Sequence, residues 1–371
     1  MKIVQIHKEY AVNSIGGVEE YIRFLASLKG EHFLVCDRLK GQKEFEKSKK
    51  LNIIRTKTAK TRFNQFVLEK EKLVILKNLN PDLMFIHGPT SFTGSVLLGT
   101  FTSLFFEDQA WVKYDCKKIM IFHGLPSVVL AGKFRIPFLF RLWKDIEEKN
   151  LIFSDKCIYV DKYVRNFIPE SFRSKLTYIP NPVDLRTFKA SEKTKSRNYL
   201  NKRFNLRLKR SDFVFSFINR FSSEKGVNSL IDFEKILNVK HKLLIVGDGP
   251  VKSPVLKVTK NGNCFYLGKL NNEDLPFVLN SSNFVFNPIR HPASSRVALE
   301  SLACRVPVIT TGIGDRYPVI DDKTGIIYDD LNEVPLKLKS FIYSKKNFII
   351  INDFSSDKVI LKITSIIKSL V

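Results

Sequence analysis

The stretch NFVFNPIRHPASSRVALESLACRVPVIT, residues 283–310, carries a strand, a helix and a second strand in that order. Asn283–Asn287 is a short apolar run that predicts a buried strand, and Pro307–Thr310 predicts another. Between them, Ser295–Cys304 has the apolar spacing of an amphipathic helix, with Ser294 or Ser295 as its N-cap. This order of elements is typical of a parallel α/β sheet.

The same alternation extends upstream of this stretch. It predicts strands and helices, in chain order, at Phe213–Asn219, Val227–Leu237, His241–Gly247, Cys264–Leu267 and Asn271–Leu279. Together these elements predict a doubly wound domain over residues 212–352.

The N-terminal half alternates in the same way. Strands are expected at Lys2–His7, His32–Cys36, Leu51–Arg55, Leu83–His87, Lys118–His123 and Lys156–Val160, and helices at Val18–Leu28, Phe63–Leu79 and Phe138–Lys149. The sequence therefore predicts a first α/β domain over residues 1–188.

Two further segments complete the predicted organisation. Residues 189–211 are rich in Lys, Arg, Ser and Asn with little apolar periodicity, so we expect a basic linker and a mobile loop. Residues 353–371 contain a last helix, expected at Ser355–Leu370.

Composition favours a cytoplasmic protein with ordinary globular cores. The chain has 371 residues, of which 44% are hydrophobic. Its longest apolar run, Ser95–Phe106, is shorter than the roughly 20 residues that cross a bilayer, and no secretory signal is expected after Met1-Lys2. The five cysteines lack metal-ligand spacing and suit a reducing compartment.

The net charge of +24 points to an anionic partner or to a solvated basic surface. Nucleic acid, an anionic membrane and phosphate-bearing small molecules are the candidate partners. No nucleic-acid partner is expected, because the basic residues are spread through both halves and form no recognised DNA- or RNA-binding motif.

Ligands of doubly wound sheets bind beyond the carboxyl ends of the strands, so the loops there are candidate sites. Arg220 follows one predicted strand, and Lys225-Gly226 comes five residues later. Two fixed cations in this position can neutralise a diphosphate, whereas the alternative is an ordinary charged surface loop.

The start of the helix near residue 295 is a second candidate site. Backbone N–H groups at Ser294 and Ser295 can hold sugar or phosphate oxygens. Glu300 lies nearly two turns into an otherwise apolar helix and needs a partner, either a ribose diol or a nearby lysine.

The N-terminal half offers candidates at three strand ends. Gly16 and Gly17 precede a predicted helix, where a backbone can approach a ligand closely or simply make a tight turn. His87 and His123 each end a predicted strand and are each followed by glycine. Both are candidate site residues, and the alternative for each is an ordinary core or surface histidine whose hydrogen bonds are satisfied.

In order and spacing these motifs resemble the retaining glycosyltransferases of family 4. The resemblance runs from about Lys2 to about Asp330 and includes the last helix. It rests on Gly16-Gly17, His123, Ile179–Asp184, Arg220 with Lys225-Gly226, Val246–Pro250, Leu267-Gly268 and Leu299–Ile309.

The resemblance implies the GT-B fold, in which two Rossmann-like domains face a central cleft and the C-terminal helix returns to the N-terminal domain. It implies transfer of a hexose, with retention, from a nucleoside-diphosphate sugar to a hydroxyl of a glycan or lipid-linked acceptor. The setting would be bacterial surface polysaccharide biosynthesis, and neither a cofactor nor a metal would be required.

The resemblance also implies roles for particular residues. Gly16 and Gly17 would approach the donor diphosphate, and His123 would contact the transferred sugar. Arg220 and Lys225 would clamp the diphosphate. The remaining donor-binding residues would lie beside the base or at the helix that contacts the ribose: Gly268, Lys269, Ser294, Ser295, Arg296, Val297 and Glu300.

The chain departs from the family pattern around the donor sugar. Pro292 stands where the family has the first of two glutamates, and Asn219 replaces a glycine before Arg220. Ala293, Ser294 and Ser295 replace the usual glycines. Two alternatives therefore stay open: a subunit that binds sugar nucleotide without transfer, and a sugar-nucleotide epimerase of the same fold.

The segment Lys133–Lys144 mixes cations with aromatic residues. It predicts peripheral contact with an anionic membrane at the inner face of the cell or with a lipid-diphosphate-linked acceptor. The alternative is a core-facing helix with basic flanks.

Overall fold

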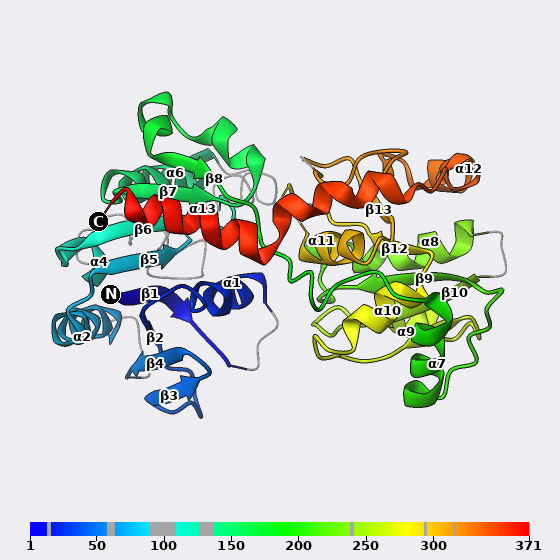
Figure 1. The fold of residues 1–371 in the computed structure, drawn as a ribbon, viewed down its shortest axis with the longest axis horizontal. Helices are drawn as coiled ribbons and strands as arrows, with labels where there is room; N and C mark the ends of the chain where they lie inside the picture. Colours follow the sequence, from blue (N-terminus) through cyan, green and yellow to red (C-terminus); the bar gives the residue numbers. More distant parts are fainter. Residues whose placement is uncertain are drawn as a thin grey trace. The chain divides into compact units, whose positions relative to one another are not determined.

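The computed structural model describes residues 1–12, 16–57, 64–88, 109–125, 137–237, 241–292, 295–314 and 316–370. They form two compact units (Figure 1). One unit comprises Met1–Asn181 with Asp357–Val371, and the other comprises Pro182–Ser356.

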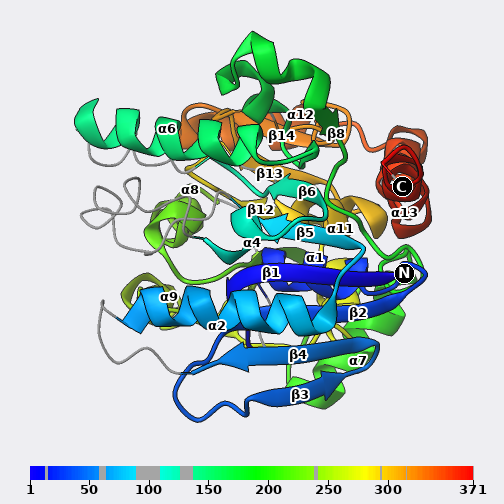
Figure 2. The same cartoon turned by 90° about the vertical axis from the view of Figure 1, so that its left-hand side faces the viewer.

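The first unit contains an eight-stranded sheet in the order β3-β4-β2-β1-β5-β6-β7-β8, seen face-on in Figure 2. Neighbouring strands are parallel except β3 and β4. The strands are β1 Lys2–Glu9, β2 Glu31–Asp37, β3 Phe45–Ser48, β4 Leu51–Thr56, β5 Leu83–His87, β6 Lys117–Phe122, β7 Lys156–Tyr159 and β8 Leu176–Tyr178.

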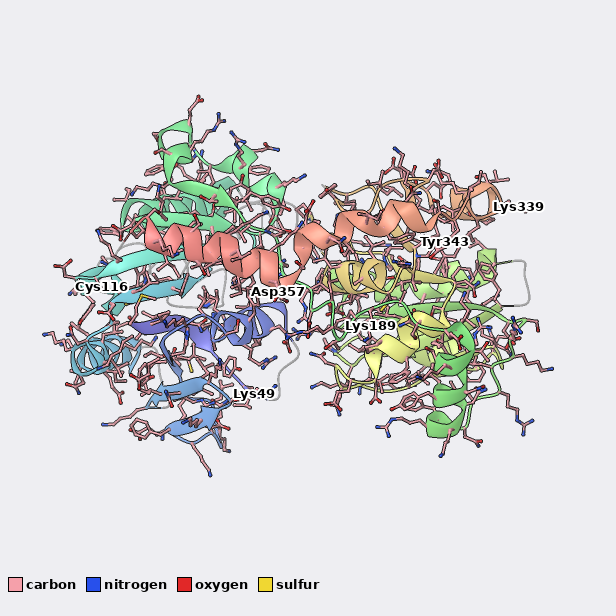
Figure 3. All side chains as sticks on the ribbon, in the orientation of Figure 1. Lys49, Cys116, Lys189, Lys339, Tyr343 and Asp357 are labelled. Carbon is pink, nitrogen blue, oxygen red and sulfur yellow. The ribbon has the colours of Figure 1, made fainter. Side chains whose placement is uncertain are left out.

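The hairpin that adds β3 was not expected from the sequence. Lys49, labelled in Figure 3, turns the chain between β3 and β4 with a φ of 53°. Only two positions of β3 are half-buried and none is buried, so its residues lack the apolar run that marks the other strands.

Helices cover the first sheet on both faces. Figure 2 shows α2 and α6 in front of the strands. The helices and 3₁₀ segments of this unit are α1 Gly17–Leu25, α2 Asn64–Leu79, α4 Ala110–Lys113, α6 Pro137–Ile152, η2 Lys162–Phe167, η3 Glu170–Lys175 and α13 Ser356–Lys368.

The C-terminal helix α13 belongs to the core of the first unit, as expected. Asp357, labelled in Figure 3, lies in its first turn. Val359, Ile363 and Ile367 lie in one buried cluster with side chains of α1 and the sheet. About 350 residues separate α13 from β1 along the chain. This packing therefore brings the last helix and the first strand into one core and closes a long loop of chain.

The second unit contains a six-stranded parallel sheet in the order β11-β10-β9-β12-β13-β14. The strands are β9 Phe213–Ile218, β10 His241–Val246, β11 Cys264–Tyr266, β12 Phe284–Asn287, β13 Val308–Thr311 and β14 Gly325–Tyr328. The predicted pair of parallel α/β domains is thereby confirmed.

The helices of the second unit are distributed along the whole segment. They are α7 Lys193–Phe204, α8 Leu230–Ile236, α9 Ser253–Val258, α10 Leu275–Ser281, α11 Arg296–Ala303 and α12 Val334–Ser340. The 3₁₀ segments are η4 Ser223–Lys225, η5 Val227–Ser229, η6 Leu331–Glu333 and η7 Lys345–Phe354.

A basic linker and a mobile loop were expected at residues 189–211. The structure instead has helix α7 in this segment. Arg197 is 2% exposed, and its guanidinium donates to the carbonyls of Ser281, Lys209, Arg210 and Asp212. A buried position of this helix is therefore occupied by an arginine whose charge is satisfied by carbonyl groups. The helix lacks the apolar periodicity by which helices are recognised in a sequence, and it was not predicted.

Among the described residues, no helix is both long and apolar enough to cross a membrane. Of the segment at residues 133–144, residues 133–136 lie outside the described part of the chain.

We expect Ile363→Ala to lower the free energy of unfolding by about 3 kcal/mol, because it empties a fully buried position in α13. Leu361→Ala in the same helix is the control, since Leu361 is 68% exposed and its replacement should cost well under 1 kcal/mol. Urea unfolding of both variants checks this, and equal stability would show that α13 does not contribute to the core.

Candidate functional site

In the second unit the loops that follow three neighbouring strands are hydrogen-bonded to one another. The N–H of Gly247 donates to the carbonyl of Gly268 at 2.9 Å, and the N–H of Phe221 donates to the carbonyl of Asp248 at 2.9 Å. A Cβ on Gly247 would lie 1.9 Å from the carbonyl oxygen of Asn219. The turn after β10 therefore needs glycine, because backbone from the next loop occupies the side-chain position.

The two predicted diphosphate-binding cations lie in the loop between β9 and α8. Arg220 is exposed and Lys225 is half-buried. Burial alone would raise the pKa of the Glu224 carboxyl, yet its pKa is lowered by hydrogen bonds from Ser222 and from backbone, with smaller contributions from the charges of Lys225 and Arg220. Arg220, Glu224 and Lys225 all belong to the loop that follows β9.

Gly226 places this loop against the loop that follows β12. Its φ is +73°, and a Cβ there would lie 1.9 Å from the carbonyl oxygen of Pro288. The N–H of Arg290 donates to the carbonyl of Glu224 at 2.9 Å. The position of Lys225 is therefore fixed by close backbone contact on its C-terminal side.

Lys225 lies 3.2 Å from His291, measured from Nζ to Nε2. An ammonium group can only donate, so Nε2 of His291 accepts and the ring is neutral. Burial, together with the charges of Lys225 and Arg316, lowers the pKa of His291 to about 4. The contact therefore orients Lys225 without cancelling its charge.

Arg316 was not identified from the sequence, although it holds the loops after β12 and β13 together. It is 7% exposed and donates to the carbonyls of Thr311, His291 and Ile289. Only the structure reveals this role, because the surrounding residues carry no motif.

The helix α11 begins at Arg296 with Ser295 as its N-cap, whose Oγ accepts from the N–H of Ala298 at 3.4 Å. Glu300 is 5% exposed, and its Oε1 lies 2.7 Å from Nη2 of Arg296. An arginine one turn earlier is thus one of its partners. Ser294 lies outside the described residues.

The other predicted donor-binding residues of this unit border the same sheet edge. Val297 is half-buried in the first turn of α11. Gly268 follows β11 with a φ of +74°, and a Cβ there would meet open space. Lys269 beside it is exposed.

In the first unit, Gly16 and Gly17 lie at the start of α1. A Cβ on Gly16 would collide with the carboxyl group of Glu19, which folds back over the start of the helix. Asn13–Ile15, which precede these glycines, lie outside the described residues. The predicted contact of Gly16 and Gly17 with a diphosphate remains a prediction.

His87 and His123 are brought together, because β5 and β6 are neighbouring parallel strands. Nδ1 of His87 lies 3.0 Å from Nε2 of His123, and the two rings stack at 14°. Gln5 on β1 adds a third group, with its Oε1 2.8 Å from Nε2 of His87.

Burial lowers the pKa of His123 to about 3, and it lowers the pKa of His87 well below the usual value. Both rings are therefore neutral at physiological pH. Tyr21 on α1 and His7 on β1 complete this cluster, with edge contacts to His123 and His87 respectively. Among the described residues, no group of three or more His, Cys, Asp and Glu could hold a metal ion.

The sequence pointed to His123 and His87 but missed Gln5, His7 and Tyr21. Gln5 and His7 are polar residues two positions apart in β1, on either side of Ile6. That spacing places them on one face of the sheet and was the available signal.

We expect Gly226→Ala to lower the free energy of unfolding by more than about 1 kcal/mol, because the new methyl group would overlap the Pro288 carbonyl at a left-handed φ. Gly262→Ala is the matched control, since a Cβ there meets nothing within 4 Å. Thermal unfolding of the two variants checks this, and equal stabilities would contradict the close backbone approach.

Comparison with known proteins gives partial matches. Residues 199–336 match the family model of glycosyl transferases group 1. An uncharacterized glycosyltransferase of Methanocaldococcus jannaschii, MJ1178, is 26% identical over 61% of this chain and 58% of its own length.

Two further relatives match a shorter part of the chain. The capsular polysaccharide biosynthesis glycosyltransferase CapM of Staphylococcus aureus is 29% identical over 37% of this chain and 38% of its own length. The putative teichuronic acid biosynthesis glycosyltransferase TuaC of Bacillus subtilis is 31% identical over 37% of this chain and 33% of its own length. The chain thus matches less than two thirds of the length of each relative.

Solved structures are similar over the whole chain. Sucrose-phosphate synthase of Thermosynechococcus elongatus has a TM-score of 0.78 at 17% identity, covering 100% of this chain and 98% of that one. HepE of Anabaena, in complex with UDP and glucose, has a TM-score of 0.70 at 14% identity and covers 100% of both chains. The chain has the GT-B fold, and its residues 199–336 match the model of glycosyl transferases group 1.

Proposed function

We propose that this protein is a retaining glycosyltransferase of family 4 that transfers a hexose from a nucleoside-diphosphate sugar to a hydroxyl of a glycan or lipid-linked acceptor. The observation that carries the proposal is that Arg220 and Lys225 lie on one loop at the carboxyl edge of a parallel sheet, and that close backbone contact at Gly226 holds this loop. That edge is where doubly wound sheets bind ligands.

The proposed setting is bacterial surface polysaccharide biosynthesis, in the cytoplasm or at the inner face of the membrane. The names of CapM and TuaC, which refer to capsular polysaccharide and teichuronic acid, support this setting. The absence of a nucleic-acid-binding motif leaves the sugar nucleotide and its acceptor as the proposed partners.

In the proposed donor complex, Arg220 and Lys225 clamp the diphosphate. A guanidinium binds two phosphate oxygens in a plane, and an ammonium supplies a compact charge. The neutral His291 ring orients Lys225 without forming an ion pair with it. The backbone N–H groups at Ser295 add the positive end of α11.

The remaining donor contacts would lie along the same edge. Glu300 would accept hydrogen bonds from the ribose hydroxyls, with Arg296 keeping the carboxylate in place at 2.7 Å. Gly268 and Lys269 would border the base. Gly16 and Gly17 in the first unit would approach the diphosphate, and His123 would contact the transferred sugar.

In the proposed reaction, the bond between the anomeric carbon and the diphosphate oxygen breaks, and the leaving diphosphate gains a negative charge. Arg220 and Lys225 stabilise that charge as it develops. The acceptor hydroxyl then attacks the anomeric carbon from the face that the diphosphate leaves, and its proton passes to the departing diphosphate oxygen. Configuration is thereby retained without a covalent intermediate. Two cations supply the charge that a metal would otherwise provide, and we therefore propose a metal-independent reaction.

A thermal-shift screen across sugar nucleotides tests the binding step. One sugar nucleotide at about one hundred times its dissociation constant should stabilise the folded protein by about 2.7 kcal/mol, with a clear rise in Tm. The free nucleoside, which lacks the diphosphate, should give a smaller shift. The proposal would be wrong if no sugar nucleotide shifted the Tm.

We expect Arg220→Ala to lower kcat by more than about tenfold, because it removes one group that stabilises the departing charge. Arg207→Ala is the control, since Arg207 is exposed and precedes β9 at the opposite end of that strand. Product analysis with the stabilising donor and an acceptor checks this. Near-normal turnover in Arg220→Ala would contradict the assigned role.

The same assays separate the proposal from its two alternatives. A converted sugar nucleotide formed from donor alone would identify an epimerase. Donor binding without transfer to any acceptor would identify a binding subunit that lacks catalysis.

A further inference from the structure

Gln5, His87 and His123 form a hydrogen-bonded row across three neighbouring strands, β1, β5 and β6. All three lie in one unit. His87 ends β5, His123 follows directly after β6, and Gln5 lies in the middle of β1. The direction of each hydrogen bond in this row follows from which atoms can donate.

The row is anchored at Gln5. Its Nε2 lies 3.0 Å from the carbonyl oxygen of Ile22 in α1, and a carbonyl can only accept. The amide N–H therefore points to Ile22, and Oε1 points to His87. The opposite orientation would place two acceptor oxygens 3.0 Å apart inside the core, which is unfavourable.

His87 takes its tautomer from Gln5. An amide oxygen can only accept, so Nε2 of His87, 2.8 Å away, carries the hydrogen. The ring is 3% exposed, and burial together with His123 and His7 lowers its pKa, so it is neutral. A neutral imidazole has one N–H group, and Nδ1 of His87 is therefore an acceptor.

His123 takes its tautomer from His87. Its Nε2 lies 3.0 Å from the accepting Nδ1, so Nε2 of His123 must donate. Its own Nδ1 is then left with a lone pair. No hydrogen bond to this Nδ1 is formed by a residue within the described part of the chain, and the His123 side chain is half-exposed.

The turn after His123 is held in place by a separate contact. Gly124 has a φ of +155°, and the N–H of Leu125 donates to the Tyr163 hydroxyl at 3.2 Å. The hydrogen bond to His87, whose ring plane is inclined by 14° to that of His123, holds the imidazole plane itself. The ring is therefore fixed both in orientation and in tautomer.

We propose that Gln5 and His87 are positioning residues that hold His123 as the Nε2–H tautomer, so that its Nδ1 accepts a hydrogen bond from a neutral hydroxyl of the substrate. The identity of the substrate group rests on the proposed function, whereas the tautomer does not. A lone pair at this atom repels carboxylate and phosphate oxygens, so the sugar face that meets His123 carries a hydroxyl and no anionic group.

Imidazole nitrogen NMR of the full-length protein tests the tautomer directly. The chain has six histidines, so ¹⁵N-histidine labelling gives a small set of signals that single substitutions can assign. We expect both His87 and His123 to show one neutral Nε2–H form at pH 7. A charged ring, or an Nδ1–H form of His123, would overturn the proposal whether or not the protein is active.

Two variants test the relay. Gln5→Met keeps the length of the side chain but removes the acceptor for His87, and His87→Phe keeps a ring but removes the acceptor for His123. Each should give a mixture of tautomers at His123 and lower kcat/KM by about threefold or more. If one of them fails to fold, the other still provides the test.

Gln109→Met is the matched control. Gln109 is a second buried glutamine of the same unit, and its Oε1 accepts from Trp111 Nε1 at 2.7 Å. This variant should leave the His123 tautomer unchanged. Tautomer mixing in Gln109→Met, or an unchanged single tautomer in Gln5→Met, would show that the row does not set the tautomer.

Titration with the sugar nucleotide that stabilises the protein separates the two proposals. Binding should move the Nδ1 resonance of His123 towards that of a hydrogen-bonded nitrogen, with Nε2–H retained. A change to the Nδ1–H or charged form would refute the hydroxyl contact. If no sugar nucleotide binds, the proposed function fails and the hydroxyl contact fails with it, while the tautomer result stands alone.

Discussion

The close approach of backbone to backbone at the carboxyl edge of the second sheet is the constraint on which the site depends. Gly226 lies against the carbonyl of Pro288, and Gly247 lies against the carbonyl of Asn219. Parallel strands deliver their loops to one edge, and only residues without a side chain let those loops meet. Arg220 and Lys225 therefore lie on a loop that backbone contacts hold on both sides. Such a loop would lose little conformational entropy on binding an anion.

Several cations at this edge contact other groups of the protein. Arg316 donates to backbone carbonyls at three positions, and Arg296 is paired with Glu300. Lys225 instead contacts a neutral imidazole, which orients the ammonium without neutralising it. The arginines that build the loops are thus distinct from the cations that can act on a phosphate.

The sequence predicted most strands and long helices because their apolar periodicity is regular, and it predicted strand-end residues because topology places them. It missed β3, whose residues are largely exposed, and α7, whose buried Arg197 has no apolar signature. It also missed Gln5 and Arg316, since their roles come from hydrogen bonds to residues distant in sequence. Periodicity reports which face is buried, whereas the partner of a buried polar group is set by the tertiary fold.

In both units polar side chains lie at the carboxyl ends of strands, but their charges differ. The first unit presents neutral imidazoles, since burial keeps the pKa of His87 and His123 low. The second presents fixed cations. A nucleoside-diphosphate sugar has the same asymmetry, with an anionic diphosphate and a sugar whose hydroxyls are neutral. A cation beside those hydroxyls would stabilise the ground state as much as the transition state, whereas cations confined to the diphosphate stabilise most the charge that appears as the bond breaks.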